Sequence, residues 1–175
     1  MLNKINFLFV TLFGIGKIKK IPGSFASLTT TLFLFFLFHL LNVPPNIVLI
    51  GVIIVFLISL YAVNIFIKDL DNKDPKEVVI DEFIGQSIPI CLYEITHEGS
   101  KETGQVLTFY FIMFILFRIF DIVKPYPVSY YDKNFKNSFG VIMDDVCAGL
   151  YVVAVLVLYM VLSTWKNFLK KLSVY

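Results

Sequence analysis

Long apolar runs separated by short polar segments make up most of this chain, and each run predicts a helix. Residues 21–67 contain no Asp, Glu, Lys or Arg, and an Asn-Val-Pro-Pro-Asn segment at residues 42–46 divides them. A helix needs about 20 apolar residues to cross a bilayer, and paired prolines interrupt helices. The pattern therefore predicts two membrane spans, over residues 25–41 and 47–67, that form a hairpin.

Two further runs predict spans over residues 105–123 and 146–165. We expect the first of these to end before Pro125, because the residue that precedes a proline resists the α conformation. Residues 126–143 then connect the two spans, with a short helix over residues 130–135.

Two more apolar runs are too short to span. Residues 5–15 predict an interfacial or re-entrant helix. The other run follows Asp81 and Glu82, and a Gly and a Pro interrupt it before the polar loop at residues 94–104. At 1.5 Å per residue this helix crosses ~30 Å of hydrocarbon only if residues 78–80 extend it, so four or five spans are expected.

Lysines in the connecting segments predict the orientation. A simple up-and-down arrangement puts nine of them on one side: Lys17, Lys19, Lys20, Lys68, Lys73, Lys76, Lys124, Lys133 and Lys136. The loop at residues 94–104 lies on the other side and contributes only Lys101. The positive-inside rule makes the lysine-rich side cytoplasmic. Five full spans would leave the C-terminal lysines outside, which favours an incomplete crossing by the helix that follows Glu82.

The composition is that of a membrane protein. Of 175 residues, 58% are hydrophobic and 16% are charged, which is far from a soluble domain of this length. We expect one domain over residues 1–175, an all-α polytopic membrane helical bundle with short interfacial helices. A net charge of +2, without a basic stripe interleaved with aromatics, argues against nucleic-acid binding. Cys91 and Cys147 lack metal-ligand spacing and are expected to be buried free thiols.

Charged residues gather in two places that this topology brings to the cytoplasmic side. The first is the pair Asp81 and Glu82. The second is the stretch 116–145, which carries Arg118, Asp121, Lys124, Asp132, Asp144 and Asp145 between two long apolar runs. Because a charge in or near hydrocarbon costs several kcal/mol, such groups indicate a functional site.

The paired carboxylates suggest a metal site. Asp81 and Asp144 could each cap a helix, and capping is the simpler interpretation for either pair alone. A cap needs one carboxylate, however, and a second one adds like-charge repulsion. Neighbouring carboxylates commonly bind Mg²⁺, which keeps waters that a phosphate can replace. The hypothesis is that Asp81, Glu82, Asp121, Asp144 and Asp145 bind one or two Mg²⁺.

Arg118 and Lys124 would add positive charge beside the metal. Arg118 and Asp121 share a helical face, so they could simply form an ion pair, and Lys124 could reach the lipid headgroups. Together, an Arg fork and a Lys at the membrane surface can also bind a phosphate. Gly23 and Ser24 precede a helix and could offer backbone N–H groups to it, although a plain turn is the simpler interpretation.

Two points stay open at this stage. Asp132 either supports the site from outside or caps its local turn. The alternative function is a small helical membrane transporter or channel whose acidic residues relay ions, which predicts charges at mid-membrane. His39 and His97 are placed at mid-membrane and in the opposite loop, so neither is expected to act as a general base here.

Three acidic blocks resemble one known family. VVIDEFIG at residues 78–85, FRIFDIVKPYPVSYYDK at 117–133 and FGVIMDDVCAGLY at 139–151 are similar to the phosphatidylglycerophosphatase A family, in family order. IPGSFASL at residues 21–28 resembles the N-terminal signature of that family. The similarity runs from about residue 14 to residue 151, which is most of the chain.

The resemblance implies a Mg²⁺-dependent phosphatase that converts phosphatidylglycerophosphate to phosphatidylglycerol at the cytoplasmic face of a bacterial inner membrane. It also implies a bundle in which one helix is largely enclosed by the others. The family's acidic positions, expected to be catalytic and metal-binding, correspond to Asp81, Glu82, Asp121, Asp144 and Asp145. Its basic positions correspond to Arg118 and Lys124.

Three residues depart from the family pattern. Ser24 stands where Thr is commoner, Ala26 replaces a usual Gly, and Gln86 stands where an apolar residue is more frequent. Gln86 lies one turn beyond Glu82, so it either hydrogen bonds to the site or makes a polar contact that stabilises the bundle.

Overall fold

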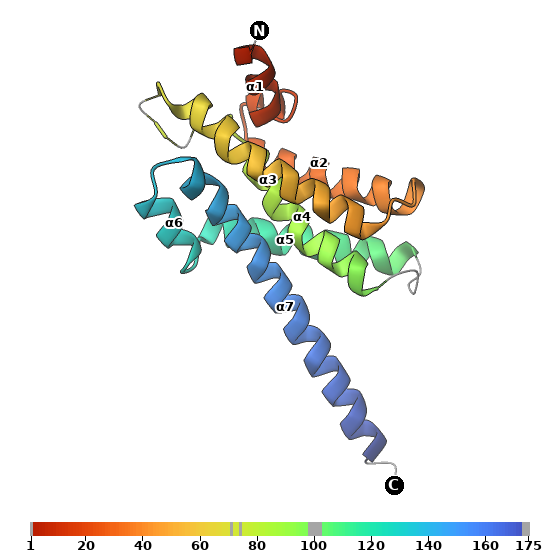
Figure 1. Ribbon diagram of the computed structural model, residues 1–175. Coiled ribbons are helices and arrows are strands. Elements are labelled where there is room, and N and C mark those ends of the chain that lie inside the picture. The colour runs from red at the N-terminus through yellow and green to blue at the C-terminus, as the bar shows by residue number, and fades with distance from the viewer. Residues whose placement is uncertain (1, 71, 74, 98–102, 173–175) are drawn as a thin grey trace.

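The structure is a computed structural model of the chain that describes residues 2–70, 72–73, 75–97 and 103–172. Within these ranges every regular element is helical, as the sequence predicts (Figure 1). The elements are α1 (Leu2–Val10), η1 (Ile15–Lys17), α2 (Pro22–Phe35), its π-helical continuation η2 (Phe36–Leu40), α3 (Pro45–Ile67), α4 (Ile80–Thr96), α5 (Thr103–Val123), α6 (Val128–Asn134) and α7 (Ser138–Leu172).

Four helices among the described residues are long and apolar enough to cross a membrane. They are Pro22–Leu40, Pro45–Ile67, Gly104–Val123 and Ser138–Lys166. Large apolar side chains on their outer faces are exposed, such as Leu57 at 59% and Phe111 at 64%. An apolar surface of this extent suits lipid and not water. The chain is therefore an integral membrane protein with the four strongest spans that the sequence predicts.

Helix α4 is enclosed by α2, α3, α5 and α7. Its Ile84, Ile90 and Cys91 are buried, and so are its polar Gln86 and Ser87, because the neighbours of this helix are protein and not lipid. It is not one of the four candidate spans, but it runs from one end of the bundle to the other (Figure 1). The incomplete crossing by this helix that the lysine distribution favours stays a prediction.

Two glycines let α4 and α7 touch backbone to backbone. A Cβ atom added to Gly85 would lie 2.5 Å from the carbonyl oxygen of Asp145, and one added to Gly149 would lie 2.3 Å from that of Gly85. Pro89 has no N–H to donate to the Gly85 carbonyl four residues earlier, so this carbonyl is free to face α7. The crossing brings the first turn of α4 next to Asp145.

The last helix, α7, begins earlier than the sequence predicts. α7 begins at Ser138 and continues without a break, so Asp144 and Asp145 lie inside the helix and not at its beginning. The apolar residues before this pair already continue the helical pattern. In Figure 1, α7 extends well past the other helices and away from the end where α6 lies. The predicted short helix before it is confirmed as α6, shifted by one or two residues.

The N-terminal helix α1 lies against the last turns of α3 and outside the bundle (Figure 1). The Asn6 side chain donates a hydrogen bond to the Ala62 carbonyl oxygen at 3.0 Å, and the rings of Phe7 and Phe66 lie 6.0 Å apart. α1 ends at Val10 and is not among the candidate spans, so the prediction of a helix over residues 5–15 is too long at its C-terminal end.

Candidate functional site

The beginnings of α2, α4 and α7 and the ends of α3 and α5 meet at one end of the bundle (Figure 1). A cavity of about 460 Å³ opens there. It is lined by nine residues that the sequence predicts for the site: Gly23, Ser24, Asp81, Glu82, Arg118, Asp121, Lys124, Asp144 and Asp145. Segments far apart in the sequence therefore contribute their charged side chains to one space.

Three carboxylates form the tightest cluster in this cavity. One oxygen each from Asp81, Glu82 and Asp145 lie within 4.8 Å of one another. Asp81 and Asp145 are only 7% and 3% exposed, and Oε2 of Glu82 is buried without a hydrogen-bond partner among the described residues. Like charges this close repel strongly away from water, and a divalent cation is the usual means of offsetting them. Asp121 and Asp144 line the same cavity but are bound by cationic side chains.

Arg118 and Asp121 form an ion pair across one helical turn, with 2.6 Å between Nη1 of Arg118 and Oδ2 of Asp121. The same Nη1 donates a longer hydrogen bond of 3.4 Å to the Ser27 hydroxyl. The pair does not use all of the guanidinium, since Nε of Arg118 is buried and has no partner in the part of the chain that the structure describes. Arg118 therefore retains donors for a further ligand.

Lys124 bridges two carboxylates. Its ammonium group lies 2.6 Å from Oδ1 of Asp132 and 2.7 Å from Oδ2 of Asp144, so it does not extend toward lipid headgroups. Burial would lower the pKa of the Lys124 ammonium, but the charges of Asp144 and Asp132 outweigh burial and raise this pKa. Lys124 is therefore a permanent cation at neutral pH.

The backbone of Lys124 is strained. Its φ is +48°, in the left-handed region that costs a non-glycine residue roughly 1–2 kcal/mol. Its N–H donates to the Phe120 carbonyl oxygen at 2.9 Å and closes the last turn of α5. Strain of this kind often marks a functional position, and here it directs the side chain toward Asp132 and Asp144.

Asp132 and Gln86 do not line the cavity. Asp132 accepts a hydrogen bond from Lys124, which is the contact expected if Asp132 supports the site from outside. Gln86 is fully buried, and neither its oxygen nor its nitrogen has a hydrogen-bond partner within the described residues. Neither of the two contacts expected for Gln86 is present.

Gly23 and Ser24 occupy the first turn of α2. A Cβ atom on Gly23 would lie 2.0 Å from Oε1 of Glu82, so this glycine makes room for the carboxylate. The Ser24 N–H donates to the Ile21 carbonyl oxygen at 3.1 Å and is not available to a phosphate. The predicted N–H cradle is therefore incomplete, because Pro22 has no N–H and that of Ser24 is already used.

The acidic pairs are not simple helix caps. Val79 precedes α4, and no side chain caps that helix. Within each pair the first aspartate accepts a hydrogen bond from the N–H of the next residue, at 3.1 Å from Glu82 to Asp81 and at 3.0 Å from Asp145 to Asp144. Asp144 is well inside α7, where a cap has no function.

The sequence did not reveal a second polar cluster at the far end of α4. Oε1 of Glu94 accepts a hydrogen bond of 2.9 Å from the Tyr110 hydroxyl and lies 3.1 Å from Nε2 of His39. Glu94 is buried in α4, which continues to Thr96, so the predicted loop at residues 94–104 begins too early. The only hint of this cluster in the sequence is that Glu94, a lone carboxylate, directly follows an apolar run.

The arrangement argues against the transporter or channel alternative. An ion relay requires acidic groups spaced along a path through the membrane. The five carboxylates of the cavity instead lie together at one end of the bundle.

Comparison with known proteins identifies a family over most of the chain. A family model described as phosphatidylglycerophosphatase A matches residues 8–160. A protein of Haemophilus influenzae named phosphatidylglycerophosphatase A is 36% identical over 155 residues, which cover 89% of this chain and 88% of that protein. One of the same name from Escherichia coli K12 is 28% identical over 153 residues, covering 87% and 81%. No solved structure matches this chain. The resemblance seen in the acidic blocks is thus confirmed, and the chain belongs to the phosphatidylglycerophosphatase A family.

Proposed function

We propose that this protein is a Mg²⁺-dependent lipid phosphatase that hydrolyses the terminal phosphomonoester of phosphatidylglycerophosphate. The products are phosphatidylglycerol and inorganic phosphate. The observation that carries the proposal is the cluster of Asp81, Glu82 and Asp145 in a cavity shared with Arg118 and Lys124. The choice of substrate is supported by two relatives that are named after this activity and that are similar to this chain over most of their length.

The donor set fits Mg²⁺. All three clustered side chains offer carboxylate oxygens, the ligands that Mg²⁺ prefers. One of these oxygens, on Glu82, is buried and has no hydrogen-bond partner within the described ranges. Five carboxylates and four cationic side chains line the cavity, which leaves a formal charge of about −1. Asp81, Glu82 and Asp145 would hold the ion. When bound, Mg²⁺ supplies Lewis acidity that stabilises negative charge on the phosphate.

Arg118 would bind the phosphate oxygens. A guanidinium has five N–H donors, of which Asp121 engages only part, so Arg118 can hold this carboxylate and a phosphate together. Asp121 in turn fixes the orientation of the guanidinium. Donors fixed in advance stabilise a developing charge better than mobile ones, because they need not reorganise during the reaction.

Lys124 would act as a fixed charge and not as an acid. Its pKa is raised by Asp144 and Asp132, so it is a poor proton donor to the leaving oxygen. Two of its three N–H groups bond these carboxylates, and the third is available to the phosphate. During hydrolysis, water forms the new P–O bond while the bond from phosphorus to the glycerol oxygen breaks. A proton from that water ends on the leaving oxygen.

The site's position suits a lipid substrate. Arg118 and Asp121 lie near the end of one candidate span, and Lys124 directly follows it. A lipid headgroup can therefore reach the cavity while its acyl chains stay in the bilayer. The lysine-rich segments around this end support a cytoplasmic orientation in a bacterial inner membrane.

The test is phosphate release from phosphatidylglycerophosphate by purified protein, with Mg²⁺ or with EDTA. We expect activity to require Mg²⁺ and to fall by about 100-fold or more in Asp81→Asn and Asp145→Asn. Asp69→Asn is the matched control, since Asp69 is exposed and does not line the cavity. Full activity in EDTA, or in either cavity variant, would contradict the proposal.

A further inference from the structure

Two lysines outside the predicted site line the same cavity as the carboxylates. Lys19 belongs to the segment between η1 and α2, and Lys76 to the segment between α3 and α4. Both are exposed, and neither forms an ion pair with a carboxylate that the structure describes. They add positive charge to a cavity that already has Arg118 and Lys124 for a terminal phosphate.

Lys76 also links this cavity to two neighbouring recesses. One, of about 510 Å³, shares Lys19, Pro22 and Lys76 with the cavity. The other, of about 540 Å³, shares Asn72, Pro75 and Lys76 with it. The carboxylate cavity therefore borders two recesses on the surface between α1 and the end of α3.

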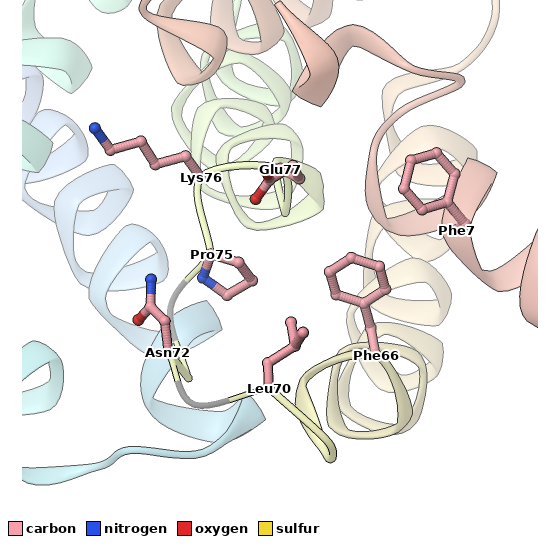
Figure 2. A pocket seen from close by; sticks show the side chains of 7 residues that line it. All are labelled: Phe7, Phe66, Leu70, Asn72, Pro75, Lys76 and Glu77. Atoms are coloured by element: carbon pink, nitrogen blue, oxygen red, sulfur yellow. The ribbon is translucent and has the colours of Figure 1, made fainter. Parts of the chain in front are cut away.

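The second recess is largely apolar. Figure 2 shows Phe7 of α1 and Phe66 of α3 on one side of it, with Leu70 and Pro75 nearby. In the same view the Lys76 side chain extends away from the two phenylalanines, toward the side where α7 (pale blue) lies. Lys76 therefore stands between an apolar recess and the charged cavity.

This order of surfaces matches the order of groups along a lipid that bears two phosphates. Such a lipid carries a terminal phosphomonoester, a glycerol, a phosphodiester and then its diacylglycerol. The carboxylate cluster with Arg118 suits the first group, and the apolar recess suits the glycerol part of the last, whose acyl chains stay in the bilayer. The two lysines lie where the remaining anion would fall.

Resting on the proposed function, we propose that Lys19 and Lys76 form a second anion subsite that binds the phosphodiester of the lipid substrate. The subsite selects lipids with two phosphates over those with one. Its ammonium groups bind a group that does not react, so they contribute equally to the bound substrate and to the transition state. They therefore act on KM and not on kcat.

The experiment measures kinetics on phosphatidylglycerophosphate in mixed micelles for Lys19→Ala, Lys76→Ala and the double variant. Loss of a charge-assisted contact typically costs about tenfold in affinity, so we expect KM in the double variant to rise about tenfold or more with kcat within about twofold. Arg at both positions should restore KM. Competitive inhibition by inorganic phosphate, which needs only the terminal-phosphate site, should be unchanged.

Lys133→Ala is the control, because Lys133 is exposed in α6 and lines none of the cavities described here. An unchanged KM in the double variant, or an equal rise in Lys133→Ala, would overturn the subsite. So would a parallel loss of inhibition by phosphate, which would indicate general damage to the site. A wild-type protein that releases no phosphate from this lipid would instead overturn the proposed function, and the subsite with it.

Discussion

Gly85 of α4 and Gly149 of α7 are in backbone contact: a Cβ atom on Gly149 would lie 2.3 Å from the Gly85 carbonyl oxygen. No side chain separates the two helices at this level. Glu82 lies about one turn before Gly85, and Asp145 one turn before Gly149. The contact therefore fixes the distance between the carboxylates that the two helices contribute to the cavity.

The first prediction follows from this contact. In Gly85→Ala the added methyl group forces α4 and α7 apart, which typically costs about 1–3 kcal/mol in a packed core. We expect phosphate release to fall by roughly 100-fold, because a shift of about 1 Å in catalytic groups has such an effect. The thermal unfolding temperature should also decrease.

Gly51→Ala provides the matched control for this substitution. A Cβ atom on Gly51 of α3 meets no atom within 4 Å, so both activity and unfolding temperature should stay at the wild-type level or rise slightly. Equal losses in the two variants would mean that the crossing of α4 and α7 has no special role.

The second prediction is that substitution of Lys124 reduces kcat more than substitution of Asp132 does. Lys124→Ala removes a cation from the cavity and should reduce kcat by about 100-fold or more. Asp132→Asn leaves the cation in place but removes one charge that holds it, so a loss of roughly tenfold is expected. The measurement is kcat for both variants; an Asp132 variant with wild-type kcat would show that Asp144 alone orients Lys124.

Glu94 should matter for stability and not for catalysis. In Glu94→Leu the Tyr110 hydroxyl loses its buried acceptor, which costs about 1–3 kcal/mol, and the unfolding temperature should fall. Glu94→Gln keeps an acceptor oxygen and should be milder. Since this cluster lies at the opposite end of α4 from the cavity, kcat of the folded Glu94→Leu protein should stay within about twofold of wild type. A large decrease in kcat would reveal coupling along α4.

Replacing Gln86 should raise the stability of the protein, whereas replacing Glu94 should lower it. Its amide is fully buried and has no hydrogen-bond partner in the described structure, so it loses solvation without compensation. Gln86→Met has a similar volume and should raise the unfolding temperature, by an amount equivalent to about 1–2 kcal/mol. If the variant is instead less stable, Gln86 has a partner, such as a buried water, that its amide needs.

Much of the fold follows from the sequence because hydropathy reports directly on contact with lipid. The hairpin over residues 25–41 and 47–67 and the span that ends before Pro125 lie within a few residues of the observed helices. Helix ends were harder to predict. Apolar residues before Asp144 extend α7 back to Ser138, and Glu94 remains helical because Tyr110 and His39 bind it from other helices.

The residues of the candidate site could be predicted from the sequence, but their distances from one another could not. Placing segments on one side of a membrane is enough to bring Asp81, Asp121 and Asp145 to the same end. Which carboxylates cluster depends on the contact between Gly85 and Gly149, and no local pattern reports on a contact between distant helices. Lys19 and Lys76 were used only to assign orientation, since loop lysines are too common to signal a binding site.

The central claim is that Asp81, Glu82 and Asp145 form the metal site, and equilibrium Mg²⁺ binding to purified protein without substrate tests it most directly. The account predicts saturable binding by the wild type and by Asp69→Asn, accompanied by a higher unfolding temperature. Binding should be weakened by at least about tenfold in each of Asp81→Asn, Glu82→Gln and Asp145→Asn. Wild-type Mg²⁺ affinity in these three variants would contradict the account.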